Sequence, residues 1–389
     1  MSDLQHLHSD WLKPFVAVLS YLRFTGIDIF DGHWLRHYLK IKYIYFVLHL
    51  IVNIQIFRFL AEAISDGVNL IDVATDISYL LISLESNFTL LILHLFRKIK
   101  SFVSRLGEEW CDDGSLSPDL IALGRKELKS FTRFNYLYLA GITLYVLTYM
   151  LIPASIIIVR KTIFKEEIPH ILPFRLIVPF NYEDDFLLYL MVYGFLFVMT
   201  LNLSYLINGG IILLTSCISQ LRVLFDLLQH EFRNIFNSKG DFNMEDKINR
   251  AIRKHSRLLK LIRELSDAFG AIFALHLFLL SAVICFFGIT AMINGNLGDL
   301  KNLMAAIIST ATIYYCCYQG QLLTDCAVDV GTAIYDSEWY LLSREHKKIV
   351  LIIILRKGIN YFKLDLTEEQ LNKLERLQNC IRFIFGLSK

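Results

Sequence analysis

The chain has 389 residues and a net charge of +2; 55% of the residues are apolar, 20% are charged, and the mean hydropathy is +0.47. Soluble domains carry about 45–50% apolar and about 25% charged residues, so this composition excludes a large soluble enzyme and an intrinsically disordered chain. The net charge gives no indication of a nucleic-acid partner, and none is expected.

The first 40 residues contain four aspartates and no long apolar run, which is not the pattern of a cleavable signal peptide. Beyond them, six apolar stretches reach the length of about 20 residues that a helix needs to cross a membrane. In chain order they lie near residues 41–63, 70–96, 131–159, 186–216, 267–293 and 303–325. A seventh and more polar candidate is 367–388. The pattern predicts an all-α polytopic membrane protein, a single domain (1–389) with six transmembrane helices, or seven transmembrane helices where 367–388 also crosses.

Positive charge alternates between the segments that connect these stretches. Four segments, beginning with the N-terminal one, together hold 28 lysines and arginines, whereas the three connections between them hold five. Basic loops stay in the cytoplasm. We therefore expect the N-terminus to be cytoplasmic and, with a seventh crossing, the C-terminus to be extracellular.

Helical spacing of apolar residues continues beyond the fourth stretch, and a basic amphipathic segment follows at 244–266. The run 347–357 is apolar on all sides but too short to cross, so it requires burial. We expect a cytoplasmic helical anchor domain built from approximately 217–266 and 326–358, where subunits meet. The alternative is a set of interfacial helices on anionic membrane lipid, and lipid is in any case an expected partner.

A specific motif follows the sixth stretch. It reads Ala-Ile-Tyr-Asp-Ser at 333–337, continues with Trp339 and Tyr340, and leads into a basic, apolar segment that ends at Leu355-Arg356. Together with the chain length and the loop sizes, this pattern resembles the C-terminal signature of insect odorant receptors.

The resemblance implies a ligand-gated, non-selective cation channel that small volatile organic molecules open. It implies the odorant-specific, ligand-tuning subunit, which assembles with a shared co-receptor into a heterotetramer around a central pore. It also implies a multi-pass protein of the plasma membrane, in the dendrite of a sensory neuron. Two alternatives stay open, a gustatory receptor channel and a multi-span solute transporter.

Enzyme motifs are missing from the sequence. There is no C-x-x-C pair among the seven cysteines and no H-E-x-x-H, G-x-S-x-G or P-loop motif. We expect no enzymatic activity, no cofactor and no metal site.

The C-terminal segment 367–388 is amphipathic, with charged residues beside an apolar stripe. Periodicity alone favours a cytoplasmic helix that never crosses, because charged side chains are costly at the bilayer centre. The resemblance instead implies a pore helix whose last turns form a hydrophobic gate that closes by dewetting. The gate residues it implies are Ile384, Phe385 and Leu387, with Ser388 just beyond.

The resemblance also implies a ligand cavity in the outer half of the membrane between spans two, three, four and six. Tyrosines at helical spacing there could stack on a ligand or donate a hydrogen bond, although such residues more often serve packing. The ligand-binding residues that we predict are Tyr79, Ser83, Tyr145, Tyr149, Ile152, Tyr189, Tyr193, Phe197, Met304, Ile307 and Ala311.

Ionisable residues within the spans complete the sequence-based expectations. Glu85 lies deep and needs a partner or water, so we expect it to touch the inner rim of the cavity or a neighbouring span. Asp72 and Asp76 are expected to lie near the outer surface, in water. Three isolated histidines are expected to be packed or interfacial, namely His49, His94 and His276.

Overall fold

The computed structural model describes residues 9–25, 35–94, 97–111, 118–165, 172–182, 185–237, 244–294, 300–342, 346–348 and 350–351. Within these ranges the chain forms helices and no strand, which confirms the all-α prediction. The helices are α1 (Ser9–Phe24), α2 (Leu35–Ser65), α3 (Ala74–His94), α4 (Arg97–Cys111), α5 (Pro118–Val159), the π-helical turn η2 (Arg160–Phe164), α6 (Phe186–Asn237), α7 (Met244–Asn294), α8 (Leu300–Tyr335) and the 3₁₀ turn η4 (Trp339–Leu341).

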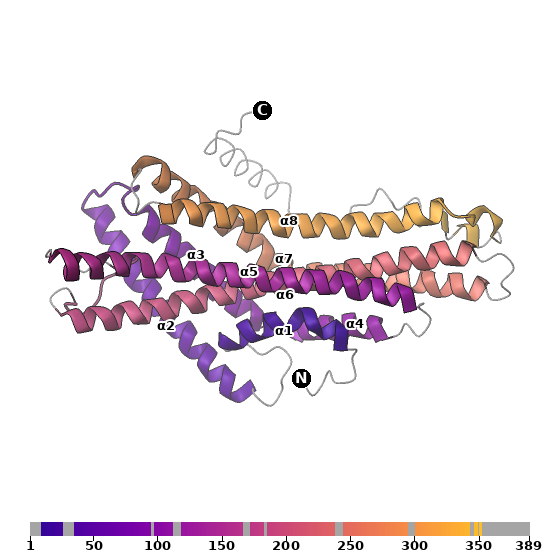
Figure 1. The fold of residues 1–389 in the computed structure, drawn as a ribbon, viewed down its shortest axis with the longest axis horizontal. Coiled ribbons are helices and arrows are strands. Elements are labelled where there is room, and N and C mark those ends of the chain that lie inside the picture. The colour runs from indigo at the N-terminus through magenta and orange to yellow at the C-terminus, as the bar shows by residue number, and fades with distance from the viewer. Residues whose placement is uncertain are drawn as a thin grey trace.

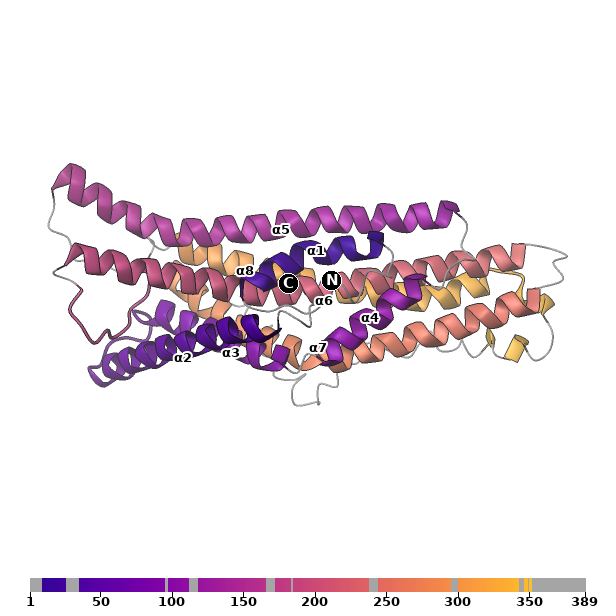
Figure 2. The same cartoon turned by 90° about the horizontal axis from the view of Figure 1, so that it is seen from below.

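Four long helices, α5 to α8, run along the long axis of the molecule (Figures 1 and 2). Helix α6 lies at the centre, since it contacts α1, α3, α5, α7 and α8. Its 52 residues give a helix of about 78 Å at 1.5 Å per residue, well above the roughly 40–45 Å of a whole bilayer. The predicted continuation of the fourth span into a longer helix is therefore confirmed, and α7 is likewise continuous from Met244 to Asn294.

Four helices of the described chain are long and apolar enough to cross a membrane, and they contain the predicted first, third, fourth and fifth spans. Their apolar parts are Tyr43–Ser65, Ala122–Ser155, Phe186–Ile235 and Met244–Met292. Large apolar side chains point outward on them, for example Phe57 on α2 and Leu144 on α5. An outward apolar surface of this extent requires lipid or another protein.

The predicted second and sixth spans form helices α3 and α8, which are not among these four. Polar residues of α3 point inward, since Ser78, Ser83, Glu85 and Ser86 are all buried. The predicted seventh span, 367–388, lies outside the described residues, as do the gate residues Ile384, Phe385, Leu387 and Ser388 and residues 352–358 of the predicted anchor.

The largest apolar core is formed mainly by the second halves of α6 and α8 and the first half of α7. The short helices α1 and α4 pack against these segments. Phe225 and Phe232 of α6 are fully buried in this core. Helix α1 was not predicted, because its apolar residues form no long run. They nevertheless recur at helical spacing, and Phe15, Leu19 and Leu22 are buried against the core. A 16-residue helix is too short to cross, so it covers the core instead.

Candidate ligand-binding cavity

A cavity of about 140 Å³ lies between α3, α5, α6, α7 and α8. Its lining residues on the last three helices lie in the first half of α6, the second half of α7 and the first half of α8. These segments lie side by side because α7 runs antiparallel to α6 and α8 (Figure 1). The walls are mostly apolar and aromatic. They are formed by Tyr79, Ile82 and Glu85 of α3, Ile142, Tyr145, Val146 and Tyr149 of α5, Thr200, Leu203, Ser204, Ile207, Asn208 and Ile211 of α6, His276, Leu280 and Phe287 of α7, and Ala305, Ile308, Ser309 and Thr312 of α8.

Three of the predicted ligand-binding residues line this cavity, namely Tyr79, Tyr145 and Tyr149. The other eight do not line it: Ser83, Ile152, Tyr189, Tyr193, Phe197, Met304, Ile307 and Ala311. A ligand role for any of the eleven stays a prediction, which the position of the cavity favours for the first three.

The predicted face of α8 is rotated from the one that lines the cavity. Met304 and Ile307 are 44% and 48% exposed, while the adjacent residues Ala305 and Ile308 face inward. On α6, the cavity begins at Thr200, further along the helix than the predicted tyrosines. Periodicity identifies a face only to within about one residue, which explains the difference on α8.

Two of the predicted tyrosines, Tyr189 and Tyr193, do not line the cavity but belong to an apolar cluster with residues of α2, α3 and α5. The hydroxyl of Tyr193 donates a hydrogen bond to the carbonyl oxygen of Met150. Phe197 packs against the same cluster, whereas Ile152 is 49% exposed. Ser83 is fully buried outside the cavity wall. Tyr189, Tyr193 and Phe197 therefore pack against neighbouring helices in this structure, whereas Ile152 does not.

The segment 172–182, which precedes α6, covers one end of the helix bundle close to the cavity. The ring of Phe174 stacks on Tyr79 with 3.6 Å between centroids and an interplanar angle of 19°. Tyr79 itself lines the cavity, and its hydroxyl lies 3.4 Å from that of Thr200. The backbone N–H of Ile177 donates to the carbonyl oxygen of Gln55 on α2 at 3.5 Å. The segment is thereby held to both α2 and α3.

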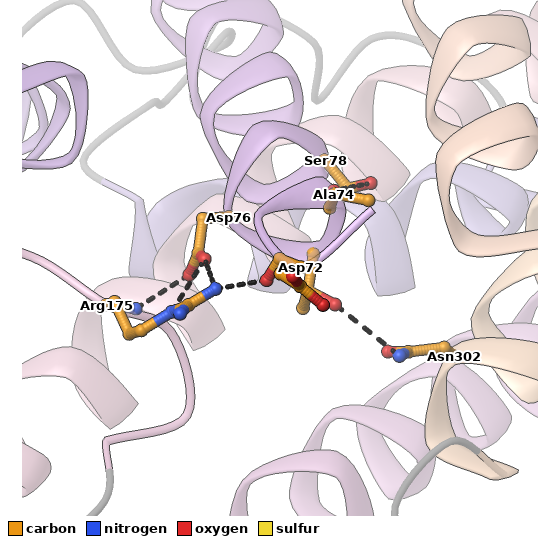
Figure 3. A network of polar contacts seen from close by, with 7 residues as sticks. Asp72, Ala74, Asp76, Ser78, Arg175 and Asn302 are labelled. Carbon is orange, nitrogen blue, oxygen red and sulfur yellow. Dashed lines mark hydrogen bonds and ion pairs between the residues drawn. The ribbon is translucent and has the colours of Figure 1, made fainter. Parts of the chain in front are cut away.

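Arg175 provides the strongest of these attachments (Figure 3). Its backbone N–H and its Nε donate to the two carboxylate oxygens of Asp76, at 2.7 and 3.0 Å, and its guanidinium also donates to the carbonyl oxygen of Asp72. The guanidinium lies 5.0 Å from the ring centroid of Phe59. The expectation that Asp76 is in water was wrong, because it is 2% exposed and paired with an arginine 99 residues away.

A buried pair of ionisable residues lies in the cavity wall. Nδ1 of His276 on α7 bonds Oε1 of Glu85 on α3, and the two residues are 4% and 2% exposed. The expected partner of Glu85 is confirmed, and so is its contact with a neighbouring helix. His276 is buried, as expected, and nothing in the sequence indicated that it pairs with Glu85. His49 bonds Asn202 of α6 at 3.3 Å and is also buried as expected; the side chain of His94 lies outside the described residues.

A second polar group includes two residues of the cavity wall, Asn208 of α6 and Thr312 of α8. The hydroxyl of Tyr138 donates to Oδ1 of Asn208 at 3.0 Å and lies 3.1 Å from the hydroxyl of Thr312. Sequence reasoning missed Asn208 and the other polar residues of α6 that line the cavity. The signal was present, since Thr200, Ser204 and Asn208 recur every four residues on an otherwise apolar helix.

Long apolar helices around a small internal cavity define a multi-pass helical membrane protein. Residues 69–357 match the family 7tm Odorant receptor. The chain belongs to this family of receptors, which is not a family of enzymes, and the resemblance noted at residues 333–340 is confirmed.

Individual relatives agree with this assignment. Odorant receptor 85b of Drosophila melanogaster is 25% identical over 210 residues, which are 52% of this chain and 53% of that protein. Odorant receptor 85c of the same organism is 21% identical over 79% of this chain and 80% of its own length. The matched region thus spans about half of the first relative and most of the second.

The fold is that of solved insect olfactory receptors. The structure of the insect olfactory receptor OR5 from Machilis hrabei matches with a TM-score of 0.75 and 12% identity, over 98% of this chain and 100% of that one. Its complex with eugenol matches with the same TM-score and 13% identity, over 99% and 100%. This match confirms the predicted fold class.

Proposed function

We propose that this chain is the ligand-tuning subunit of an odorant-gated, non-selective cation channel, and that the odorant binds in the cavity between α3, α5, α6, α7 and α8. The observation that carries the proposal is the mostly apolar cavity between the helices in a member of the odorant receptor family. Its volume of about 140 Å³ suits a small volatile molecule, since an engineered apolar cavity of about 150 Å³ binds benzene. A solved receptor of the same fold has been studied in complex with eugenol.

The proposed channel activity requires a defined orientation of the chain in the membrane, a pore helix and an anchor that holds the subunits together. We place the N-terminus in the cytoplasm and the C-terminus outside, with 367–388 as the pore helix. The extensions of α6, α7 and α8 beyond the membrane share one large apolar core, which supports a cytoplasmic anchor built from approximately 217–266 and 326–358. There the chain would meet a shared co-receptor in a heterotetramer of the plasma membrane, in a sensory dendrite.

Electrical recording tests the proposal directly. Oocytes that express the chain with the co-receptor should give cation currents when exposed to a broad panel of volatiles, beyond those of oocytes with the co-receptor alone. A solute carrier would give no such large gated current, and a gustatory channel would respond to sugars or bitter compounds. Surface expression without any volatile-evoked current would contradict the proposal.

Replacing Tyr149 with alanine should shift the dose–response curve of an activating volatile. Tyr149 lines the cavity, and losing its ring should raise the half-maximal concentration about tenfold, or roughly 1.4 kcal/mol of binding free energy. Ile152→Ala is the matched control, because Ile152 lies one turn further on α5, is 49% exposed and is outside the cavity. Equal curves for the two variants would place the ligand elsewhere.

Phe385→Ser should produce current in the absence of any odorant. The family resemblance makes Phe385 part of a hydrophobic gate, and a hydroxyl there would allow water to wet the constriction. Resting current is measured by patch clamp, with surface biotinylation to confirm delivery. Phe383→Ser, two residues earlier and not among the gate residues, should keep the low resting current; an unchanged resting current in Phe385→Ser would contradict the assignment.

A further inference from the structure

The buried pair of Glu85 and His276 lies in the wall of the cavity, and this placement bears on which odorants fit. The pair joins α3 to α7 through one oxygen of the carboxylate and one nitrogen of the imidazole. Each residue is more than nine-tenths buried. A ligand role for the pair rests on the proposed function, because it concerns the ligand of the same cavity.

Each partner has a second polar atom without a hydrogen-bond partner. Oε2 of Glu85 and Nε2 of His276 are the buried side-chain atoms of the described cavity wall that lack one. Several other polar groups of the wall are bonded to each other, as in Tyr79 with Thr200, or to a neighbour, as in Thr312 with Tyr138. Buried polar atoms are nearly always bonded, so these two atoms indicate an interaction that a ligand completes.

The chemistry of the two atoms selects a functional group. A carboxylate oxygen only accepts, so Oε2 requires a donor. Nε2 donates when His276 is protonated and accepts when it is neutral, and a hydroxyl group suits both states because it donates and accepts. An ether, ketone or ester oxygen cannot donate to Oε2. An ammonium group could, but it would bring a full charge into a mostly apolar cavity, which is costly.

We propose that the Glu85–His276 pair makes this receptor selective for small alcohols and phenols over ethers, ketones and esters of the same size. The hydroxyl would donate to Oε2 of Glu85 and lie within reach of Nε2 of His276, while the carbon skeleton would lie against the tyrosines and aliphatic side chains of the wall. Glu85 and His276 are then specificity-determining residues for the ligand.

A smaller space on the other side of the pair offers a competing explanation for the two atoms. This second cavity has about 20 Å³ and is also lined by Glu85 and His276, together with Thr89. It can hold one water molecule but no organic ligand. If water alone completed the pair, an alcohol would have no advantage over its ether isomer.

Isomer pairs separate the two explanations. The probes are octanol with heptyl methyl ether, and cresol with anisole, each pair sharing one molecular formula. They are tested on the full chain co-expressed with the co-receptor, and by thermal stabilisation of the purified full chain. We expect the alcohol of each pair to act at about tenfold lower concentration than the ether, or roughly 1.4 kcal/mol.

Glu85→Gln is the decisive variant. An amide in place of the carboxylate can still accept from Nδ1 of His276, but it presents an N–H₂ group where Oε2 was, so the alcohol advantage should fall to about threefold or less. The response to the ether should persist and thereby serve as the folding control. Ser86→Ala is the matched control, because Ser86 is a buried residue of the same helix whose hydroxyl also lacks a partner but does not line the cavity. Its alcohol preference should equal that of the wild type.

Several results would overturn the proposal. Equal potency of alcohol and ether in the wild type, binding of neither isomer, or an unchanged preference in Glu85→Gln would each do so. If Glu85→Gln fails to reach the cell surface, His276→Gln replaces it, and the same loss of preference is required. Stabilisation by octanol without any current would leave the selectivity standing and refute the channel function instead.

Discussion

Arg175→Met should lower the melting temperature of the receptor and weaken its response to odorant. The substitution leaves the carboxylate of Asp76, which is 2% exposed, without its guanidinium partner. Leaving a buried acceptor unsatisfied costs about 1–3 kcal/mol, and more for a charged group. The segment 172–182 would then lose its main attachment to α3, and Phe174 would no longer be held firmly against Tyr79. The measurements are thermal melting of the purified receptor and the odorant dose–response curve.

Arg105→Met provides the matched control for this experiment. Arg105 forms an ion pair with Glu264 at 2.6 Å, and its side chain is 44% exposed against 47% for Arg175. The difference lies in the partner, because Glu264 is 19% exposed, so this pair should contribute no more than about 1 kcal/mol. The double variant Asp76→Asn, Arg175→Met should recover part of the stability, since it removes the uncompensated charge. Equal melting temperatures for Arg175→Met and Arg105→Met would contradict the role given to this ion pair.

Phe225→Ala should destabilise the receptor more than Arg175→Met does. Phe225 is fully buried in the core shared by α1, α4, α6, α7 and α8, and its ring contacts that of His255 with 6.4 Å between centroids. Truncating a buried phenylalanine costs about 3–5 kcal/mol, through lost burial and the cavity that remains. We expect a large loss of surface expression and of co-precipitation with the co-receptor, because this core supports the proposed anchor.

Phe57→Ala tests whether burial of the ring is the reason for the expected loss of stability in Phe225→Ala. Phe57 lies on α2 and is 65% exposed, so its truncation should change stability by no more than about 0.5 kcal/mol. Surface expression and co-precipitation of this variant should match the wild type. Normal assembly of Phe225→Ala would show that the extended parts of α6, α7 and α8 do not hold the complex together.

Which parts of the fold follow from sequence depends on the range of the interaction involved. The apolar stretches near 186–216 and 267–293 correctly located helices α6 and α7, because hydropathy is a local property of about 20 residues. The continuation of α6 to Asn237 was also predictable, since its apolar stripe keeps helical spacing beyond the membrane. Helix α1 was missed because its apolar residues form a short stripe rather than a run.

Predicting the cavity was harder, because a cavity depends on how helices are rotated against each other. Tyr79 and Tyr149 line it, whereas on α8 the face centred on Ile308 lines it in place of the one predicted around Ile307. Successive side chains of an α-helix lie about 100° apart around its axis, which is enough to move a side chain from the cavity to the lipid side. Periodicity does not contain that information, because it records spacing and not the direction of the neighbouring helix.

Amino-acid sequence alone determined that this is an all-α membrane protein, and the motif at 333–340 identified its family correctly. Hydropathy and a short specific motif are enough for both, since neither depends on distant contacts. Tertiary structure alone decided which ionisable groups meet. Asp76 is paired with Arg175 and Glu85 with His276 across 99 and 191 residues of chain, and these pairs define one end of the bundle and one wall of the cavity. Such pairs exist because a buried charge must find a partner wherever the fold places one.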